Sequence, residues 1–146
     1  MRSTIFAAGL AALGMTIGAQ AAAVTIVNGG FEDPVVTGSF DTFFANNATN
    51  DDITGWIVGA GSVDVVGPIW NTPEGSQALD LDGSSQGTIY QDISGLEVGR
   101  AYIVSFKMSG NAGAPPPIKT MKVPMGTKGA TGDPVTQQDY TFITSS

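Results

Sequence analysis

The sequence predicts an all-β protein, an antiparallel β-sandwich, and three observations support this prediction. Helical periodicity of 3.6 residues does not persist anywhere after residue 21. Short apolar runs are instead separated by clusters of Gly, Pro, Asn, Asp and Thr, which is typical of strands joined by turns. Residues 101–108 also alternate between an apolar face that begins at Tyr102 and a second face that contains Ser105 and Lys107.

The pattern predicts seven short strands, of which Ala101–Met108 is the clearest because of its alternation. The other six are expected at Val24–Val27, Val63–Val66, Gln77–Leu81, Gly87–Ile93, Ile118–Val123 and Asp139–Thr144. Residues 111–117 contain three consecutive prolines, so this stretch is expected to be a loop rather than a central strand. The pattern alone does not fix the order of the strands.

The first residues are typical of a secretory signal peptide. Arg2 is followed by an apolar stretch, Ile5–Ile17, and then by small residues at Gly18–Ala21 that fit a cleavage site. The apolar stretch is shorter than the roughly 20 residues that a membrane-spanning helix needs. We therefore expect a signal peptide at residues 1–21 and one β-sandwich domain at residues 22–146. The mature protein should be secreted or held at the cell surface, with no transmembrane helix.

Composition and charge exclude several classes of function. The chain has no His and no Cys, so it can form neither a disulfide nor a Ser-His-Asp triad, and it offers no imidazole or thiolate ligand for a metal. It contains 6 Lys and Arg against 13 Asp and Glu, for a net charge of −7. This acidic balance argues against nucleic acid as a partner.

Several sequence blocks stand in the order and spacing of a known exported family. The blocks are Val27–Glu32, Ile53–Trp56, Gly61–Val66, Pro73–Leu81, Ile89–Ile93, Gly99–Phe106 and Gly110–Asn111. Together they resemble the bacterial choice-of-anchor C family, which is similar to the plant cell-wall family called domain of unknown function 642. The resemblance implies a jelly roll of the galactose-binding-like type, an architecture used by many carbohydrate-binding modules. It also implies a cell-surface or cell-wall role with no established catalytic activity.

The end of the chain departs from that resemblance. Members of the family usually continue through further strands, including a closing strand that carries an acidic residue, whereas this sequence stops at Phe142–Ser146 within a strand-like run. We expect a product truncated at its C-terminus that lacks these last strands. A missing strand would leave a neighbouring strand with an open edge, which favours pairing or aggregation.

The candidate ligand-binding residues are aromatic and amide side chains. Trp70 lies in a loop between two expected strands and could stack on a sugar ring, although it could equally anchor the loop. Trp56 is expected to pack over the core, with stacking on a ligand as the less favoured alternative, and Phe43 and Phe44 are weaker aromatic candidates. The full set of candidate ligand-binding residues is Trp70, Asn71, Gln77, Tyr90, Gln91 and Asn111, in which the amides would hydrogen-bond sugar hydroxyls.

Acidic residues suggest a structural calcium ion. In sandwich modules of this kind, an acidic pair such as Glu32 and Asp33 after the first strand often helps to hold Ca²⁺, and the alternative is a solvated acidic turn. The missing closing-strand carboxylate weakens the calcium interpretation. Asp80 and Asp82 lie two residues apart and so share one face of a strand, but their surroundings do not fit the register of an EF-hand loop. We interpret them as part of a solvated face.

Three hypotheses for function follow, in order of preference. The first is an exported, noncatalytic module that binds extracellular or cell-wall polysaccharide weakly and requires no cofactor. The second is a structural surface or matrix protein that assembles through its sheet edges and recognises no sugar. The third is a glycoside-active enzyme, which would need a carboxylate pair about 5 Å apart around a cleft, and no such pair is evident in the sequence.

Overall fold

The computed structural model describes residues 24–45, 52–111, 114–127 and 136–144. These residues form seven strands and no helix, which confirms the predicted all-β class. The strands are β1 (Phe40–Phe44), β2 (Ile57–Ala60), β3 (Ser62–Val66), β4 (Ala78–Asp80), β5 (Thr88–Tyr90), β6 (Ile118–Met125) and β7 (Thr136–Ile143). The expected signal peptide, residues 1–21, lies outside the described residues.

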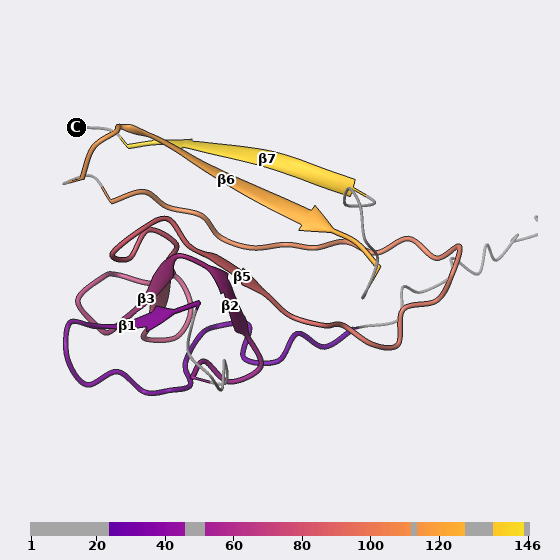
Figure 1. Cartoon of the computed structure of the whole chain (residues 1–146), viewed down its shortest axis with the longest axis horizontal. Helices are drawn as coiled ribbons and strands as arrows, with labels where there is room; N and C mark the ends of the chain where they lie inside the picture. Colours follow the sequence, from indigo (N-terminus) through magenta and orange to yellow (C-terminus); the bar gives the residue numbers. More distant parts are fainter. Residues whose placement is uncertain (1–23, 46–51, 112–113, 128–135, 145–146) are drawn as a thin grey trace, which may run out of the picture.

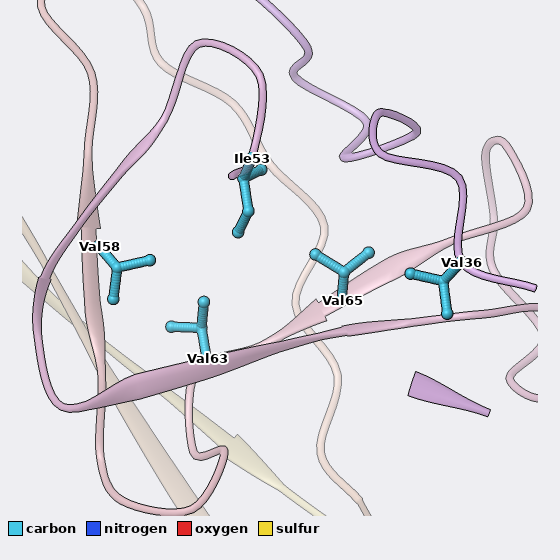
Figure 2. Packing of buried hydrophobic residues seen from close by; sticks show 5 residues of the cluster. All are labelled: Val36, Ile53, Val58, Val63 and Val65. Carbon is cyan, nitrogen blue, oxygen red and sulfur yellow. The ribbon is translucent and has the colours of Figure 1, made fainter. Parts of the chain in front are cut away.

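The strands form three antiparallel sheets, and two of these share one core. The first sheet has the order β1-β3-β4, and the second pairs β2 with β5. Val58 of β2 packs together with Val63 and Val65 of β3, and Val36 and Ile53 from the loops complete the cluster. Figure 2 shows the five side chains pointing toward one another. Because the cluster draws on both sheets, the arrangement is consistent with the predicted β-sandwich; the jelly-roll type stays a prediction.

Strand β3 is the central strand of the first sheet, and four of its five residues are buried. Val63 and Val65 point to the same face because side chains alternate along a strand, and both are completely buried. Burial of each such side chain contributes about 1.5–3 kcal/mol to folding. On either side of β3, Phe43 of β1 lies opposite Val63 and Leu79 of β4 lies opposite Val65.

The third sheet is a hairpin of β6 and β7, paired from Ile118 opposite Ile143 to Met125 opposite Thr136. It shares no strand with the other two sheets. In Figure 1 the hairpin lies apart from β1, β2, β3 and β5, and a long strandless stretch of chain runs beside it. Phe106 of that stretch contacts Tyr140 edge to face, with ring centroids 4.8 Å apart.

The strand predicted at Ala101–Met108 is wrong, because this segment is assigned to no strand. Two adjacent side chains of this segment nevertheless contact different parts of the molecule. Phe106 packs on Tyr140 of the hairpin, while Lys107 forms an ion pair with Glu74, which lies between β3 and β4. A ladder also requires a partner backbone about 4.8 Å away, and no strand pairs with this segment in the part of the chain that the structure describes.

The strand predicted at Val24–Val27 is also wrong, and the reason lies in a side chain. The backbone N–H of Val27 donates to Oε1 of Gln91, and Nε2 of Gln91 donates to the carbonyl of Val27, both at 2.9 Å. The amide of Gln91 thus occupies the position that a neighbouring strand would take. Val27 is the first residue of a turn over residues 27–30.

The remaining predictions differ from the structure mainly at their boundaries. The strands predicted at Val63–Val66 and Gln77–Leu81 correspond to β3 and β4, and the predicted Gly87–Ile93 strand is reduced to β5. The two C-terminal predictions correspond to β6 and β7, which both begin or end beyond the predicted limits. Strands β1 and β2 were not predicted. For β2 the reason is that it has only four residues and includes Gly59.

Candidate functional site

A surface hollow of about 580 Å³ lies where three segments of the chain meet. Its lining consists of residues 24, 25, 27, 55–57 and 91–95. This volume lies within the range of roughly 300–1,000 Å³ that is typical of small-molecule sites. We therefore build the candidate site from this hollow.

Gln91 joins the three segments that line the hollow. Besides its two bonds to the backbone of Val27, its Nε2 donates to the carbonyl of Gly55 at 2.7 Å. Gly55 has a φ of 79°, and a Cβ at this position would lie 2.7 Å from Cγ1 of Val27. Only glycine permits both this conformation and this close approach. Gln91 and Gly55 together fix the position of the N-terminal segment against the loop before β2.

Trp56 lines the hollow and also packs against the core, as predicted for this residue. Its Nε1 donates to the carbonyl of Asn28 at 3.1 Å, and its ring lies 5.3 Å from that of Phe31, at an interplanar angle of 38°. The indole N–H is therefore committed to the chain, and Trp56 contacts Phe31 and the core while also lining the hollow.

Residues with polar side chains also line the hollow. Thr25 and Ser94 supply hydroxyl groups, and Asp92 supplies a carboxylate; all three residues are exposed. A hydroxyl can both donate and accept, whereas an ionised carboxylate only accepts. The hollow thus combines an aromatic ring with groups that can hydrogen-bond a polyhydroxylated ligand.

The structure separates the predicted ligand-binding residues from one another. Gln91 lines the hollow, and Tyr90 precedes it on β5, where its side chain is 49% exposed. Trp70 and Asn71 are exposed on the loop after β3, where the N–H of Ile69 donates to the carbonyl of Gly67 at 2.7 Å. Neither residue of this loop lines the hollow, and exposed Asn111 does not line it either.

Gln77 lies inside the molecule rather than at its surface, with an exposed fraction of 4%. Its Oε1 accepts from the N–H of Val36 at 2.5 Å, and its Nε2 donates to the carbonyls of Phe31 and Pro34 at 2.6 and 3.0 Å. In this arrangement the whole amide of Gln77 is committed to the chain itself. It ties the segment before β1 to the start of β4.

Glu32 completes the same connection from the other side. Its carboxylate accepts from the hydroxyl and the N–H of Ser76 at 2.8 and 2.9 Å, and from the N–H of Gln77 at 3.0 Å. These bonds stabilise the ionised form, so the Ser76 hydroxyl first, and then the two backbone N–H groups, hold the pKa of Glu32 below its usual value. Gly75 has a φ of 67°, and a Cβ there would collide with this carboxylate.

Asp33, the second predicted calcium ligand, has a different partner. Its Oδ2 accepts from the hydroxyl of Thr54 at 2.6 Å, whereas Glu32 faces the segment that begins at Ser76. Calcium requires six to eight oxygen ligands. Within residues 24–45, 52–111, 114–127 and 136–144, no group of three or more acidic side chains is arranged to hold a metal ion. Calcium at this pair stays a prediction from the sequence.

Asp80 and Asp82 do not share a strand as expected, because β4 ends at Asp80. The N–H of Asp82 donates to Oδ1 of Asp80 at 2.9 Å, so the first carboxylate caps the turn that follows the strand. Asp80 lies opposite Asp64 of β3, which accepts from the hydroxyl of Thr42 at 2.7 Å. The carboxylates of Asp64 and Asp80 thus contribute to the local hydrogen bonding of the first sheet.

Sequence reasoning missed the hollow itself. Thr25 and Ser94 gave no signal as single residues, and Trp56 was expected to pack over the core in preference to stacking on a ligand. A turn was evident around Ser94 and Gly95, but nothing in the sequence indicates that this turn faces residues 24–27. The fold brings these segments together through Gln91, which bonds to Val27 across 64 positions of the sequence.

Comparisons with known proteins give one family and one relative. The model of a protein family described as "Protein of unknown function (DUF642)" matches residues 24–141, which confirms the resemblance to domain of unknown function 642. Halomucin of Haloquadratum walsbyi is 38% identical over 92 residues, an alignment that covers 59% of this chain and 1% of halomucin. The chain thus matches a very small part of that relative. No solved structure gives a significant match.

The sequence predicts a mature protein with no transmembrane helix. In the part of the chain that the structure describes, no helix has the length and apolar character needed to cross a bilayer.

Replacing Gln77 with Ala should destabilise the fold strongly. The change leaves the N–H of Val36 and the carbonyls of Phe31 and Pro34 without their partner in a buried region. We expect a loss of about 2–5 kcal/mol in the free energy of unfolding, measured by urea denaturation. Gln86→Ala is the matched control, because the side chain of Gln86 is exposed, and it should change stability by less than about 0.5 kcal/mol. Equal stability of the two variants would contradict the role of Gln77.

The lowered pKa of Glu32 predicts a dependence of stability on pH. Because the pKa of Glu32 in the folded protein lies below its ordinary value of 4.5, this carboxylate stabilises the fold above that value and loses its effect as the pH falls through the folded pKa. Urea midpoints of the wild type and of Glu32→Gln should therefore differ near neutral pH and converge in acid. The other carboxylates are common to both proteins. A difference that stayed constant between about pH 7 and pH 3 would contradict this role of the charge.

Calcium at Glu32 and Asp33 is tested by thermal melting with and without a chelator. A site that binds calcium in the folded state alone should raise the melting temperature in the presence of calcium. The rise should disappear in a Glu32→Gln and Asp33→Asn double variant. An identical melting temperature in calcium and in chelator would remove the ion from the description of this protein.

Proposed function

The chain belongs to the family described as protein of unknown function, DUF642, and on this premise we propose that it is an exported, noncatalytic surface module that binds polysaccharide. The family match and the similarity to halomucin are consistent with a surface module. The proposal of carbohydrate binding goes further, and the observation that carries it is the hollow, whose lining contains Trp56 together with residues that have hydrogen-bonding side chains.

The chemistry of the lining suits a sugar. The C–H faces of a pyranose pack on flat aromatic surfaces, and Trp56 contributes an aromatic side chain to the lining of the hollow. Sugar hydroxyls donate and accept hydrogen bonds, as do the hydroxyls of Thr25 and Ser94. The carboxylate of Asp92 adds an acceptor at the rim. These groups support binding through one sugar unit in the hollow.

Trp70 supports the same proposal from a second position. Its side chain is 37% exposed on the loop after β3, and exposed Asn71 follows it. A polysaccharide is long enough to contact more than one aromatic platform. Trp70 therefore serves in this proposal as an additional stacking residue outside the hollow, with Asn71 as a neighbouring hydrogen-bonding group.

The lining also bears on the enzymatic alternative. Glycoside hydrolysis generally uses two carboxylates, about 5–5.5 Å apart in retaining enzymes and about 6.5–9.5 Å apart in inverting enzymes. Asp92 is the one acidic residue among the described residues that line the hollow. This composition supports a binding role over a hydrolytic role at this position.

Filling the hollow should abolish binding. Ser94→Tyr places a large side chain in the lining, and we expect at least about a tenfold loss of affinity for whichever glycan retains the wild type. The measurement is a pull-down with a panel of insoluble polysaccharides, followed by titration of soluble ones. Ser84→Tyr is the matched control because Ser84 is exposed outside the hollow, and it should bind like the wild type.

A further variant, Trp70→Ala, separates the contribution of the loop after β3 to glycan affinity from that of the hollow. A smaller loss than that of Ser94→Tyr is expected if the glycan reaches from the hollow to the loop after β3. Retention of Ser94→Tyr at wild-type affinity would remove the hollow from the proposal. If no glycan retains the wild type, polysaccharide binding is to be abandoned.

A further inference from the structure

Charge is divided unequally along this chain. Residues 24–99, here called the acidic unit, contain no Lys or Arg and hold 11 of the 13 Asp and Glu residues. Residues 100–144, here called the basic unit, contain Arg100, Lys107, Lys119, Lys122 and Lys128, with Asp133 and Asp139 as their acidic residues. The acidic unit therefore carries a formal charge of −11, and the basic unit carries +3 (five basic minus two acidic residues).

The division of charge coincides with a division of the fold. Strands β1 to β5 belong to the acidic unit, and the hairpin of β6 and β7 belongs to the basic unit. The two units share no sheet. Within one chain two ion pairs join them. One links Arg100 Nε and Glu97 Oε2, three residues apart at the junction of the units. The other links Lys107 Nζ and Glu74 Oε1, whose side chains are 58% and 80% exposed. Exposed ion pairs contribute about 0–1 kcal/mol, so basic groups can exchange an acidic partner in the same chain for one in another copy.

The basic unit begins with a segment that lacks a strand partner. Residues 101–108 belong to no sheet among the described residues, although their sequence has the alternating pattern of a strand. Ile103 is 95% exposed, and Val104 and Phe106 are 49% and 40% exposed. Figure 1 shows this stretch running without a strand arrow beside the hairpin. Such a segment offers both backbone groups and apolar side chains to an added strand.

The acidic unit has a complementary edge. Strand β1 is an outer strand of the β1-β3-β4 sheet. Phe40 and Phe44, at its two ends, are 52% and 51% exposed, and Asp41 between them is exposed as well. Within the described part of the chain no further strand pairs with this edge, and it combines apolar surface with negative charge. Each of these features matches a property of residues 101–108.

We propose that copies of this protein assemble head to tail, with residues 101–108 of one copy adding as a strand to the β1 edge of a second copy. The basic unit of the first copy then lies against the acidic unit of the second. Because the two surfaces differ, each added copy leaves one surface of each kind free, so the contact generates open chains rather than a closed dimer. This proposal goes beyond polysaccharide binding and does not depend on it.

Sedimentation velocity of the purified protein over a range of concentrations and salt tests this assembly. The average mass should rise with concentration at low salt, and the association should weaken about tenfold or more as salt screens the opposite charges. A monomer at every concentration at low salt would overturn the proposal. Association that is unchanged or strengthened by salt would overturn it too.

Two variants identify the surfaces. Ile103→Pro removes a backbone N–H from the added strand, and Asp41→Lys reverses the charge on β1; each variant alone should remain monomeric. Val98→Pro and Asp82→Lys are the matched controls, since both residues are exposed outside the two surfaces, and they should assemble like the wild type. Far-ultraviolet dichroism and melting verify that each variant is folded. Should Ile103→Pro fail to fold, Asp41→Lys alone decides the matter.

A mixture of the two variants gives the sharpest result. Ile103→Pro retains an intact β1 edge, and Asp41→Lys retains an intact segment at residues 101–108, so one contact can form between them. The mixture should reach the mass of two chains and no more. Wild-type assembly by Ile103→Pro or by Asp41→Lys would overturn the proposal, and so would a mixture that remains monomeric.

Discussion

Two glutamine side chains bind backbone segments that have no strand neighbour, and the rest of the acidic unit depends on them. Gln77 binds the N–H of Val36 and two nearby carbonyls, and Gln91 binds both backbone groups of Val27. A primary amide presents one acceptor oxygen and two donor hydrogens, so it can satisfy a peptide group much as a strand does. Since the sequence contains no Cys, no disulfide can provide these connections.

The two connections have different consequences. Gln77, with Glu32, holds the segment before β1 against β4 and so places Val36 in the core between the sheets. Gln91 holds the N-terminal segment against Gly55 and so forms the hollow around Trp56. The stability of the sandwich and the shape of the candidate site thus rest on two side chains of the same type, at separate places in the fold.

The sequence predicts those parts of the fold that depend on local pattern. The strand at Val63–Val66 and the packing of Trp56 follow from apolar residues in a β context, and both are confirmed. Alternation at Ala101–Met108 predicts the directions of side chains but cannot show whether a partner strand exists. The amides of Gln77 and Gln91 were assigned to sugar because amides hydrogen-bond hydroxyls. In the structure Gln77 binds the backbone of Val36, 41 positions away, and Gln91 binds the backbone of Val27, 64 positions away. No local sequence pattern contains such a relation.

The central claim is that a glutamine amide replaces a strand neighbour, and hydrogen exchange of the Val36 amide tests it most directly. In the wild type this N–H should exchange slowly, like those of the paired residues of β3. In Gln77→Ala, under conditions in which the protein remains folded, it should exchange far faster, while the amide of Val65 remains slow. Rapid exchange of Val36 in the wild type would contradict the account, and so would unchanged protection in the variant.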